Sequence, residues 1–478
     1  MNQKLTQFLK LELFPFFKDC FKSQSDRYWL AGIVLLNALI CVYFIDQPMR
    51  VDESWTFLAS VKDSWKSVLT YITPNNHVLH SVFVKLSTSM FGAHPWSIRL
   101  PALLFGVISI LLVFCATRCF GGRGLFAAAV VATNPYMILF STNARGYSLL
   151  VCFFLALIIV GWLYARSPSK GGATAVAIVS ALGVYTIPTM VFPLSGILLW
   201  IAYVGLRSAS DRRIDFIQSY VFCGLKMALL IALLYGPVVY LSGLKPILAN
   251  DWVIPQPFGA FLKGIRWHFE DTLIHFIRDV PIIFLLICLA GVVLGFYASA
   301  KEKGNWLISL FGALVLGGGI VFFAQHSIPF ERTWIYFIPL FAMIADKGVT
   351  DAFECYAGRA VNLIAVLLCL GALTIPLRLV LNDSISKYND TGIFVDSAVV
   401  AKTLATTMKS GDAMVATDPE NFTLFFYLWY FNAPNYKYGE HEEVGKTYYI
   451  VPPSRSIDQL TKRPVKEWKT INETKIYR

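Results

Sequence analysis

Two adjacent carboxylates, Asp52 and Glu53, directly follow the first long apolar run of the chain, residues 30–45. Ionisable side chains at the edge of a bilayer are costly, so they usually mark a functional site or a charged partner. A carboxylate in such a place can deprotonate or orient a hydroxyl nucleophile. The pair also fits two ordinary polar residues that end a helix. Which groups face the carboxylates decides between these interpretations.

Groups that could face the carboxylates recur beside later apolar runs. Arg145, with Tyr147 close by, and Arg332 each stand next to the start of such a run. Arginines can clamp a phosphate bidentately and stabilise it as a leaving group. Each arginine could instead be an anchor whose stem lies along apolar surface. His77 and His80, three residues apart on one face of a short apolar segment, could likewise be satisfied polar residues.

The elements that must position these residues are membrane helices. The chain has 478 residues, of which 56% are hydrophobic and 15% charged, and its mean hydropathy is +0.58. We predict an α-helical polytopic membrane protein of about eleven spans, because the apolar runs approach the roughly 20 residues that cross a bilayer core. The expected spans are 30–45, 97–117, 124–140, 147–165, 172–187, 189–206, 217–241, 281–299, 305–323, 333–346 and 360–379.

Lys and Arg orient the spans. The basic N-terminus, residues 1–27, is expected in the cytoplasm, followed by an uncleaved anchor helix. Residues 77–92 are apolar but short, and counting them as a span would turn every later basic loop outward. We therefore predict that they form an interfacial amphipathic helix within a first external loop, 46–96. The transmembrane domain, 28–381, then presents its carboxylates, histidines and the two arginines on the external side.

After about residue 382 the composition changes, and an odd number of spans puts this part outside. Residues 411–419 indicate a short buried strand between turns, 447–451 indicate a second strand, and 421–431 have helical length. We predict a small extracytoplasmic α/β domain over 382–478. We place the whole chain in the plasma (inner) membrane of a cell, as a multi-pass protein.

Several function classes are excluded. The chain contains no zinc spacing, Walker loop, GxGxxG fingerprint or GxSxG elbow. The net charge of +11 is divided between cytoplasmic loops and the C-terminal tail, which argues against nucleic-acid binding. A metal ion would need oxygen ligands, and Asp52 with Glu53 is the one tight acidic pair near the proposed site. We expect no metal and no other cofactor.

Four segments, in order over about the first 165 residues, resemble the GT-C fold of membrane glycosyltransferases, in the branch of the protein O-mannosyltransferases and the lipid A aminoarabinose transferase. They are Asp52-Glu53, Asn75-Asn76-His77-Val78-Leu79, Phe91-Gly92 with Trp96-Ser97-Ile98-Arg99-Leu100-Pro101-Ala102-Leu103, and Asn134-Pro135 to Ala144-Arg145-Gly146-Tyr147. The last is similar to the Ser-x-x-Ala-Arg-x-Tyr segment of that branch. The paired prolines that many members carry after the Asn76 position are missing here.

The resemblance implies inverting transfer of a sugar from a polyprenyl-phosphate donor on the external face. It implies that Asp52 is the general base, assisted by Glu53, and that Arg145, Arg332 and Tyr147 hold the donor phosphate. Asn76 and His77 belong to the loop on the acceptor side. Because the prolines are missing, His77 and His80 compete for one role.

The acceptor is expected to be a lipid, a glycan or a protein. Two alternatives remain open at this point. A transporter or flippase of lipid-linked sugars would use similar charges, although such folds often show repeats that this sequence lacks. A polysaccharide ligase or polymerase would use a diphosphate-linked donor instead.

Overall fold

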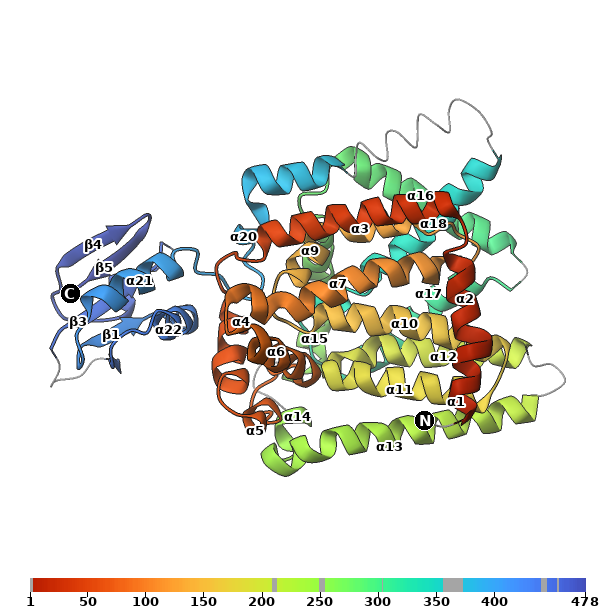
Figure 1. Cartoon of the computed structure of the whole chain (residues 1–478), viewed down its shortest axis with the longest axis horizontal. Coiled ribbons are helices and arrows are strands. Elements are labelled where there is room, and N and C mark those ends of the chain that lie inside the picture. The colour runs from red at the N-terminus through yellow and green to blue at the C-terminus, as the bar shows by residue number, and fades with distance from the viewer. Residues whose placement is uncertain are drawn as a thin grey trace.

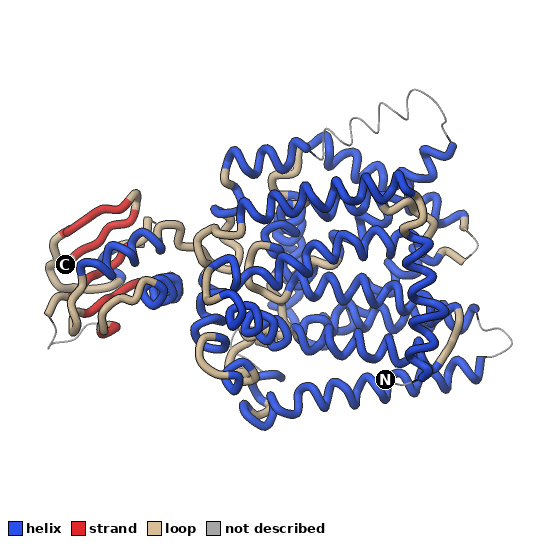
Figure 2. The backbone as a smooth tube through the Cα atoms, viewed as in Figure 1, coloured by secondary structure: helices blue, strands red, loops and turns tan. Residues whose placement is uncertain are grey.

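The computed structural model describes residues 3–208, 213–248, 254–302, 304–355, 373–439, 445–453 and 455–478. Long helices lie side by side in one bundle, and a small domain with a β-sheet sits beyond one end of it (Figure 1). Figure 2 shows that the strands are confined to this small domain in the described part of the chain. The fold is the predicted α-helical architecture with a C-terminal α/β domain.

Seven of the described helical segments are long and apolar enough to cross a membrane. They are α3 (Gln24–Phe44), α7 (Pro95–Arg118), α10 (Tyr147–Arg166), Pro188–Ser208, which joins η3 (Pro188–Met190) to α12 (Val191–Ser208), α13 (Arg213–Ser242), α16 (Ile282–Lys301) and α17 (Trp306–Gln325). Their length matches the roughly 20 residues that a bilayer requires. The chain is a multi-pass membrane protein.

The predicted span 124–140 is two helices, α8 (Leu125–Thr133) and α9 (Pro135–Ser141). Asn134 has an extended backbone between them, and its side chain accepts hydrogen bonds from the N–H groups of Tyr136 and Met137. An asparagine cap followed by proline at the first helical position favours a new helix start. The break lets the chain turn within the bundle before it reaches Arg145.

Two other predicted spans are helical in the structure but have different bounds. The span 172–187 corresponds to α11 (Lys170–Thr186), and 333–346 corresponds to η4 (Glu331–Trp334) followed by α18 (Phe337–Cys355). The span 360–379 lies largely outside the described residues, although 373–382 is helical. The number of eleven spans therefore stays a prediction.

Short helices cover the end of the bundle that faces the sheet domain (Figure 1). The first loop forms α4 (Val51–Thr56), η2 (Phe57–Val61), α5 (Trp65–Val68) and α6 (Val78–Phe91). With 14 residues, α6 is about 21 Å long at 1.5 Å per residue, too short for a bilayer core. The opposite end carries α1 (Gln3–Phe8), η1 (Leu9–Leu13) and α2 (Phe14–Cys20).

The segment 242–279 contains α14 (Lys245–Leu248) and α15 (Phe258–Ile277). One face of α15 is buried, and His268 on it accepts a hydrogen bond from the Trp334 indole at 2.7 Å. His268 is therefore a satisfied core residue. Sequence reasoning did not anticipate that α15 would also support the site, through His275 and Arg278.

The C-terminal domain has a five-stranded sheet in the order β2-β1-β3-β5-β4. β1 is parallel to β2 and β3, whereas β5 is antiparallel to β3 and β4. The strand predicted within 411–419, the strand at 447–451 and the helix near 421–431 are confirmed. The elements are α20 (Ser384–Lys387), α21 (Ser397–Thr407), β1 (Ala413–Ala416), α22 (Asn421–Tyr430), β2 (Lys437–Tyr438), β3 (Thr447–Val451), η5 (Ile457–Gln459), β4 (Glu467–Ile471) and β5 (Thr474–Tyr477).

Helix α22 docks the C-terminal domain onto the first loop. Its Phe422 ring stacks on Trp55 at a centroid distance of 4.4 Å. The Tyr427 hydroxyl accepts a hydrogen bond from the Met49 N–H at 2.9 Å. The aromatic face of α22 is thus used largely for packing against the loop that carries Asp52.

Candidate active site

Asp52 lies in the first turn of α4, where the helix dipole favours a carboxylate. Its Oδ2 lies 3.2 Å from Nη2 of Arg332 and 3.9 Å from Nη2 of Arg145. Its Oδ1 faces the Asn75 amide at 3.5 Å. The side chain is 17% exposed, so solvent or a substrate can reach it. Two guanidinium groups therefore converge on one accessible carboxylate.

Arg145 reaches this point from the tight segment between α9 and α10, and its side chain is 2% exposed. Nη1 donates to the Thr56 hydroxyl at 2.9 Å and to the Asn75 carbonyl at 2.6 Å. Nη2 donates to the Asn75 side-chain oxygen at 3.1 Å. These contacts fix the plane of the guanidinium, so Arg145 is a rigid cation and not a membrane anchor.

Arg332 belongs to η4, which precedes α18. Its Nε donates to the Tyr147 hydroxyl at 2.9 Å, and its guanidinium packs over the Phe330 ring at 4.1 Å from the centroid. The Nε side of the guanidinium thus faces Tyr147, while Nη2 faces Asp52. The structure thus brings together Asp52, Arg145, Arg332 and Tyr147, all four predicted from sequence.

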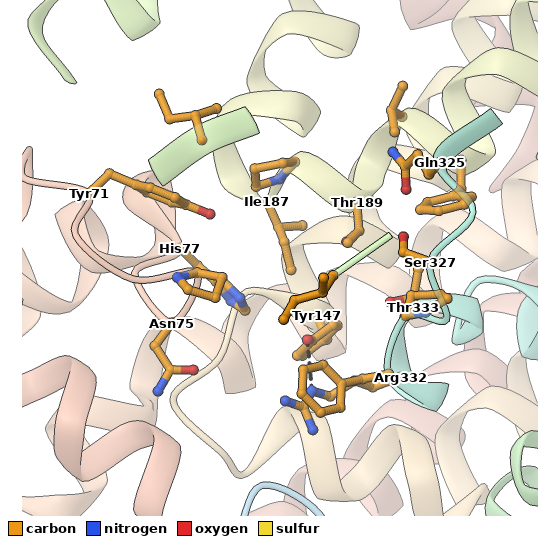
Figure 3. Close-up of a pocket in the computed structure, with 18 of the residues that line it drawn as sticks. Tyr71, Asn75, His77, Tyr147, Ile187, Thr189, Gln325, Ser327, Arg332 and Thr333 are labelled. Carbon is orange, nitrogen blue, oxygen red and sulfur yellow. Dashed lines mark hydrogen bonds between the residues drawn. The ribbon is translucent and has the colours of Figure 1, made fainter. Parts of the chain in front are cut away.

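A cavity of about 630 Å³ adjoins the two arginines. In Figure 3, Asn75 and His77 lie on one side, Gln325 and Ser327 on the opposite side, and Tyr147 with Arg332 between them. Lys245 adds a third cation to the wall. No carboxylate is among the described lining residues, so Asp52 lies next to the wall, against Arg145 and Arg332, and is not part of it. The remainder of the wall is mostly apolar, from Ile187, Pro188, Val191, Phe192, Ile247, Ile254, Pro255, Ala324, Pro329 and Phe330.

His77 lines the cavity, whereas His80 is not among the described lining residues. Nδ1 of His77 accepts a hydrogen bond from the Gly146 N–H at 2.8 Å, which assigns the ring proton to Nε2. Nε2 lies 3.2 Å from Nη2 of Arg145. Burial and the nearby Arg145 charge lower the pKa of His77 well below its usual range. His77 is therefore a neutral ring whose N–H faces another donor.

Asn76 and Asn75 have different surroundings. The Asn76 amide donates to the carbonyls of Val68 and Thr70, and its oxygen accepts from the Ser81 hydroxyl. These bonds shape the loop, and Asn76 is absent from the described cavity wall. Asn75, which was left out of the predicted site, lines the cavity and contacts both Asp52 and Arg145. Its signal was its place in the Asn-Asn-His segment.

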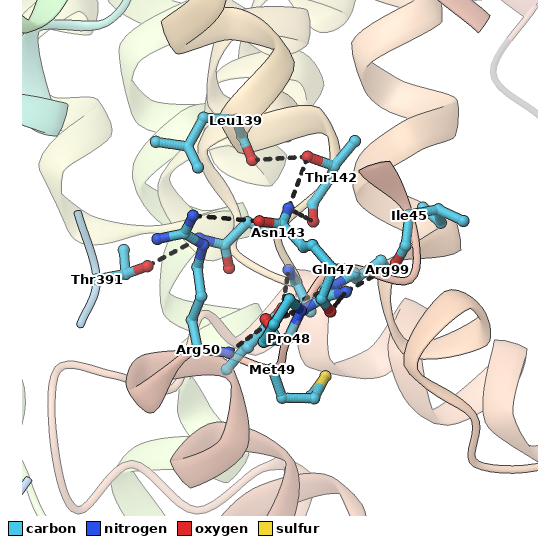
Figure 4. A network of polar contacts seen from close by, with 12 residues as sticks. Ile45, Gln47, Pro48, Met49, Arg50, Arg99, Leu139, Thr142, Asn143 and Thr391 are labelled. Atoms are coloured by element: carbon cyan, nitrogen blue, oxygen red, sulfur yellow. Dashed lines mark hydrogen bonds and ion pairs between the residues drawn. The ribbon is translucent and has the colours of Figure 1, made fainter. Parts of the chain in front are cut away.

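Glu53 belongs to a buried network with Arg50 and Arg99, whose side chains Figure 4 shows. Both its side chain and that of Arg99 are 0% exposed, and the two form an ion pair. Glu53 also accepts from the N–H groups of Arg50 and Ala144, each at 2.8 Å. All its contacts are structural, and it is not among the described cavity-lining residues. The geometry gives Glu53 a positioning role in place of the predicted direct assistance.

Arg99 completes this network from α7. Beyond Glu53, its guanidinium donates to the carbonyls of Ile45, Gln47 and Pro48, which form the turn after α3. The arginine was visible in the Trp-Ser-Ile-Arg segment, but sequence alone assigned it no partner. Through Glu53, it joins the start of α4 to the N–H next to Arg145, and so sets the relative positions of Asp52 and Arg145.

The described residues contain no group of three or more His, Cys, Asp or Glu side chains that could hold a metal ion. Asp52 would be one possible oxygen ligand, but two guanidinium groups already compensate its charge. A cationic wall suits an anionic ligand, and cavities of several hundred Å³ are typical of small-molecule sites. The arrangement can hold a phosphate beside a carboxylate that accepts a proton.

Comparisons with known proteins bear on the fold and on one segment of the sequence. A sequence model of the family described as dolichyl-phosphate-mannose-protein mannosyltransferase matches residues 76–237. A comparison with curated protein sequences finds no match. The crystal structure of ArnT from Cupriavidus metallidurans in the apo state has a TM-score of 0.55 at 12% identity, and the alignment covers 95% of this chain and 98% of ArnT.

The same ArnT bound to undecaprenyl phosphate has a TM-score of 0.54 at 12% identity, with 94% of this chain and 97% of that chain covered. At this identity the likeness shows the fold alone, and the family match covers the segment that contains His77 and Arg145. The chain is a membrane protein with the GT-C fold of glycosyltransferases, as its motifs predicted.

Proposed function

We propose that the chain transfers a sugar from a polyprenyl-phosphate donor to a hydroxyl of a lipid, glycan or protein acceptor, on the extracytoplasmic face and with inversion. The observation that carries this proposal is the convergence of Arg145 and Arg332 on Asp52, at 3.9 Å and 3.2 Å, beside a 630 Å³ cavity. The solved ArnT that shares the fold binds undecaprenyl phosphate, which supports the donor class.

The N–H groups of His77 and Arg145 that face one another have no hydrogen-bond acceptor between them, and a phosphate oxygen would supply one. The His77 Nε2–H and an Arg145 N–H face one another at 3.2 Å, and two donors so placed repel unless an anion lies between or beside them. Arg332 approaches the same region, where its Nη2 donates to Oδ2 of Asp52 at 3.2 Å. A phosphate oxygen would accept from all three residues, with charge-assisted bonds from the arginines.

The reaction is a single displacement. Asp52 accepts the proton of the acceptor hydroxyl, whose oxygen forms a bond to the anomeric carbon as the bond from that carbon to the phosphate oxygen breaks. Arg145 and Arg332 neutralise the departing polyprenyl phosphate. A double displacement would need a second carboxylate as nucleophile. Glu53, the neighbouring one, is fully buried on Arg99, so inversion fits the described site.

The experiment that tests the proposal uses the purified chain with undecaprenyl-phosphate sugars and a set of lipid, glycan and peptide acceptors. Acceptor-dependent release of undecaprenyl phosphate, with formation of a glycosidic product of inverted anomeric configuration, is expected. Movement of intact donor across a liposome bilayer without release would instead indicate a transporter. Release only from diphosphate-linked donors would indicate a polysaccharide ligase or polymerase.

A further inference from the structure

The segment that joins the helical bundle to the C-terminal domain lies directly against the start of α4. We call residues 388–393 the strap. The Asp52 N–H donates to the Thr391 carbonyl and the Val51 N–H donates to the Gly392 carbonyl, both at 3.2 Å. Arg50 and Ile393 also form an isolated antiparallel β-bridge. The backbone of the proposed base is therefore hydrogen-bonded to a segment about 340 residues later in the chain.

Arg50, the residue before α4, holds the strap by hydrogen bonds to its backbone carbonyls. Its guanidinium is fully buried and donates to the carbonyls of Ile385, Tyr388 and Asp390 at 2.5–2.7 Å. Burial lowers the pKa of Arg50 to about 10, which leaves the group cationic at neutral pH. A buried cation whose N–H groups are met by backbone carbonyls is costly to displace. Arg50 thus holds several turns of the connecting segment in one place.

Asp390 connects the strap to the C-terminal end of α15 by ion pairs. Its Oδ2 lies 2.9 Å from Nη1 of Arg278 and its Oδ1 lies 3.2 Å from Nε2 of His275. The Asp390 side chain is 5% exposed. The Arg278 guanidinium also packs over the Tyr388 ring, whose hydroxyl donates to Asp279 at 2.6 Å. One carboxylate therefore joins the strap to two residues at the end of a separate helix.

The strap backbone is strained at the point of contact. Thr391 has φ 63° and Gly392 has φ 70°, both left-handed. A β-branched residue is rarely found there, and such conformations persist where the surroundings over-determine them. The Thr391 hydroxyl accepts from the Asn143 amide at 2.9 Å, close to Arg145. A Cβ at Gly392 would lie 2.8 Å from Cγ2 of Val51, so the two segments approach as closely as glycine permits.

We propose that the strap positions the Asp52 carboxylate against Arg145 and Arg332, and that Asp390 is the positioning residue that holds the strap. This inference rests on the proposed function of Asp52. Arg145 precedes α10 and Arg332 precedes α18, while the strap fixes the backbone of the residue that must meet the acceptor hydroxyl. Because the strap leads into the domain whose α22 packs on Trp55, the C-terminal domain and α15 together hold α4.

The experiment compares Asp390→Asn and Gly392→Ala with a matched control, Glu270→Gln. Glu270 pairs with Arg266 on the exposed surface of the same helix, α15, at 2.8 Å. Hydrogen exchange of the peptide that contains residues 51–56 is measured first. Asp390→Asn and Gly392→Ala should open the Val51 and Asp52 amides to exchange, whereas the control should not, because local opening follows the loss of the strap bonds.

Transfer and donor-product binding are measured on the same proteins. Small misplacements of a reacting group can cost about 100-fold in rate, so both strap variants should lower kcat about 10- to 100-fold. The Kd of undecaprenyl phosphate should stay nearly unchanged, because Arg145 and Arg332 keep their own supports. Loss of stability alone would not separate kcat from Kd in this way.

Wild-type exchange and wild-type kcat in both strap variants would overturn the inference while leaving the proposed function intact. If the unmodified chain transfers no sugar from any polyprenyl-phosphate donor, the proposed function fails. The exchange measurement still decides in that case whether the strap holds α4. Equal exchange in Asp390→Asn, Gly392→Ala and the control would then reject the strap on structural grounds.

Discussion

The Asp52 carboxylate and the Arg332 guanidinium are 280 positions apart in the chain and 3.2 Å apart in space. Asp52 lies in the first turn of a short helix after the first span, and Arg332 lies in η4, just before α18. Arg145, from a third segment, is 3.9 Å from the same carboxylate oxygen. The helical bundle is the framework that brings these three segments to one end.

Replacing Asp52 by Asn keeps its size and removes the proton acceptor. We expect kcat for transfer to fall by about 10²- to 10⁴-fold, the usual contribution of a general base. Binding of undecaprenyl phosphate should be retained or tightened, because a negative charge next to the phosphate is lost. Titration with undecaprenyl phosphate and initial-rate measurements check both points. Asp63→Asn, on an exposed residue of the same loop, is the control.

Sequence reasoning identified the charged residues of the site because ionisable side chains are rare beside membrane-spanning segments. Asp52, Arg145, Arg332 and Tyr147 stood out beside apolar runs, and the structure brings them together. The positions of Glu53 and Asn76 were not predictable in this way. Both are polar residues next to a site residue, and only tertiary contacts show that Glu53 faces Arg99 while Asn76 bonds to the loop backbone.

The helices of the fold were predictable where a long apolar run can only be a membrane-spanning helix. Long apolar runs such as α7 and α10 were found, but the break at Asn134 and the full length of α15 were not. A break inside an apolar run leaves mean hydropathy unchanged, and α15 is too polar to be detected as a span. The strap meets Val51 and Asp52 through backbone carbonyls, which carry no signature in the residue types.

Arg332→Lys keeps the charge but removes the planar fork. Charge-assisted hydrogen bonds contribute about 1.5–3 kcal/mol each, so we expect the Kd of undecaprenyl phosphate to rise about 10- to 100-fold. Lysine also loses the Nε contact with Tyr147. Equilibrium binding to the purified protein measures the change, and Arg266→Lys, on an exposed surface, is the control. Unchanged binding would remove Arg332 from the phosphate site.

Glu53→Gln should act mainly on folding. Its partner Arg99 would be left as a buried, uncompensated cation, and breaking such a pair costs about 3–5 kcal/mol. The pair is 0% exposed on both sides, so solvent cannot compensate. Thermal unfolding in detergent should show a much larger loss for Glu53→Gln than for Asp52→Asn. An unfolding midpoint equal to that of the unmodified chain would contradict the structural role of Glu53.

His77 should make the free energy of unfolding depend on pH in the acidic range. Burial lowers the pKa of His77 below its ordinary value of 6.5 in the folded state, so below about pH 6.5 the unfolded chain binds more protons there than the folded one. The contribution of the neutral ring is present above pH 6.5 and is lost as the pH falls. Unfolding midpoints of His77→Gln and the unmodified chain, compared from pH 5 to 8, should differ in slope below pH 6.5. Parallel curves would mean that His77 does not stay neutral in the folded state.

The orientation of the chain follows from treating α6 as interfacial. With 14 residues it cannot cross a bilayer core of about 30 Å, and counting it as a span would send the basic loops outward against the positive-inside bias. We therefore expect a topology reporter to lie outside when it is fused after Gly92, inside after Arg123 and outside at the C-terminus. Alkylation of single cysteines at these three sites, in intact and in opened cells, gives an independent measurement. If the reporter after Gly92 lay in the cytoplasm, Asp52 and the cavity would face the wrong compartment for an external donor site, whatever the distances between their side chains.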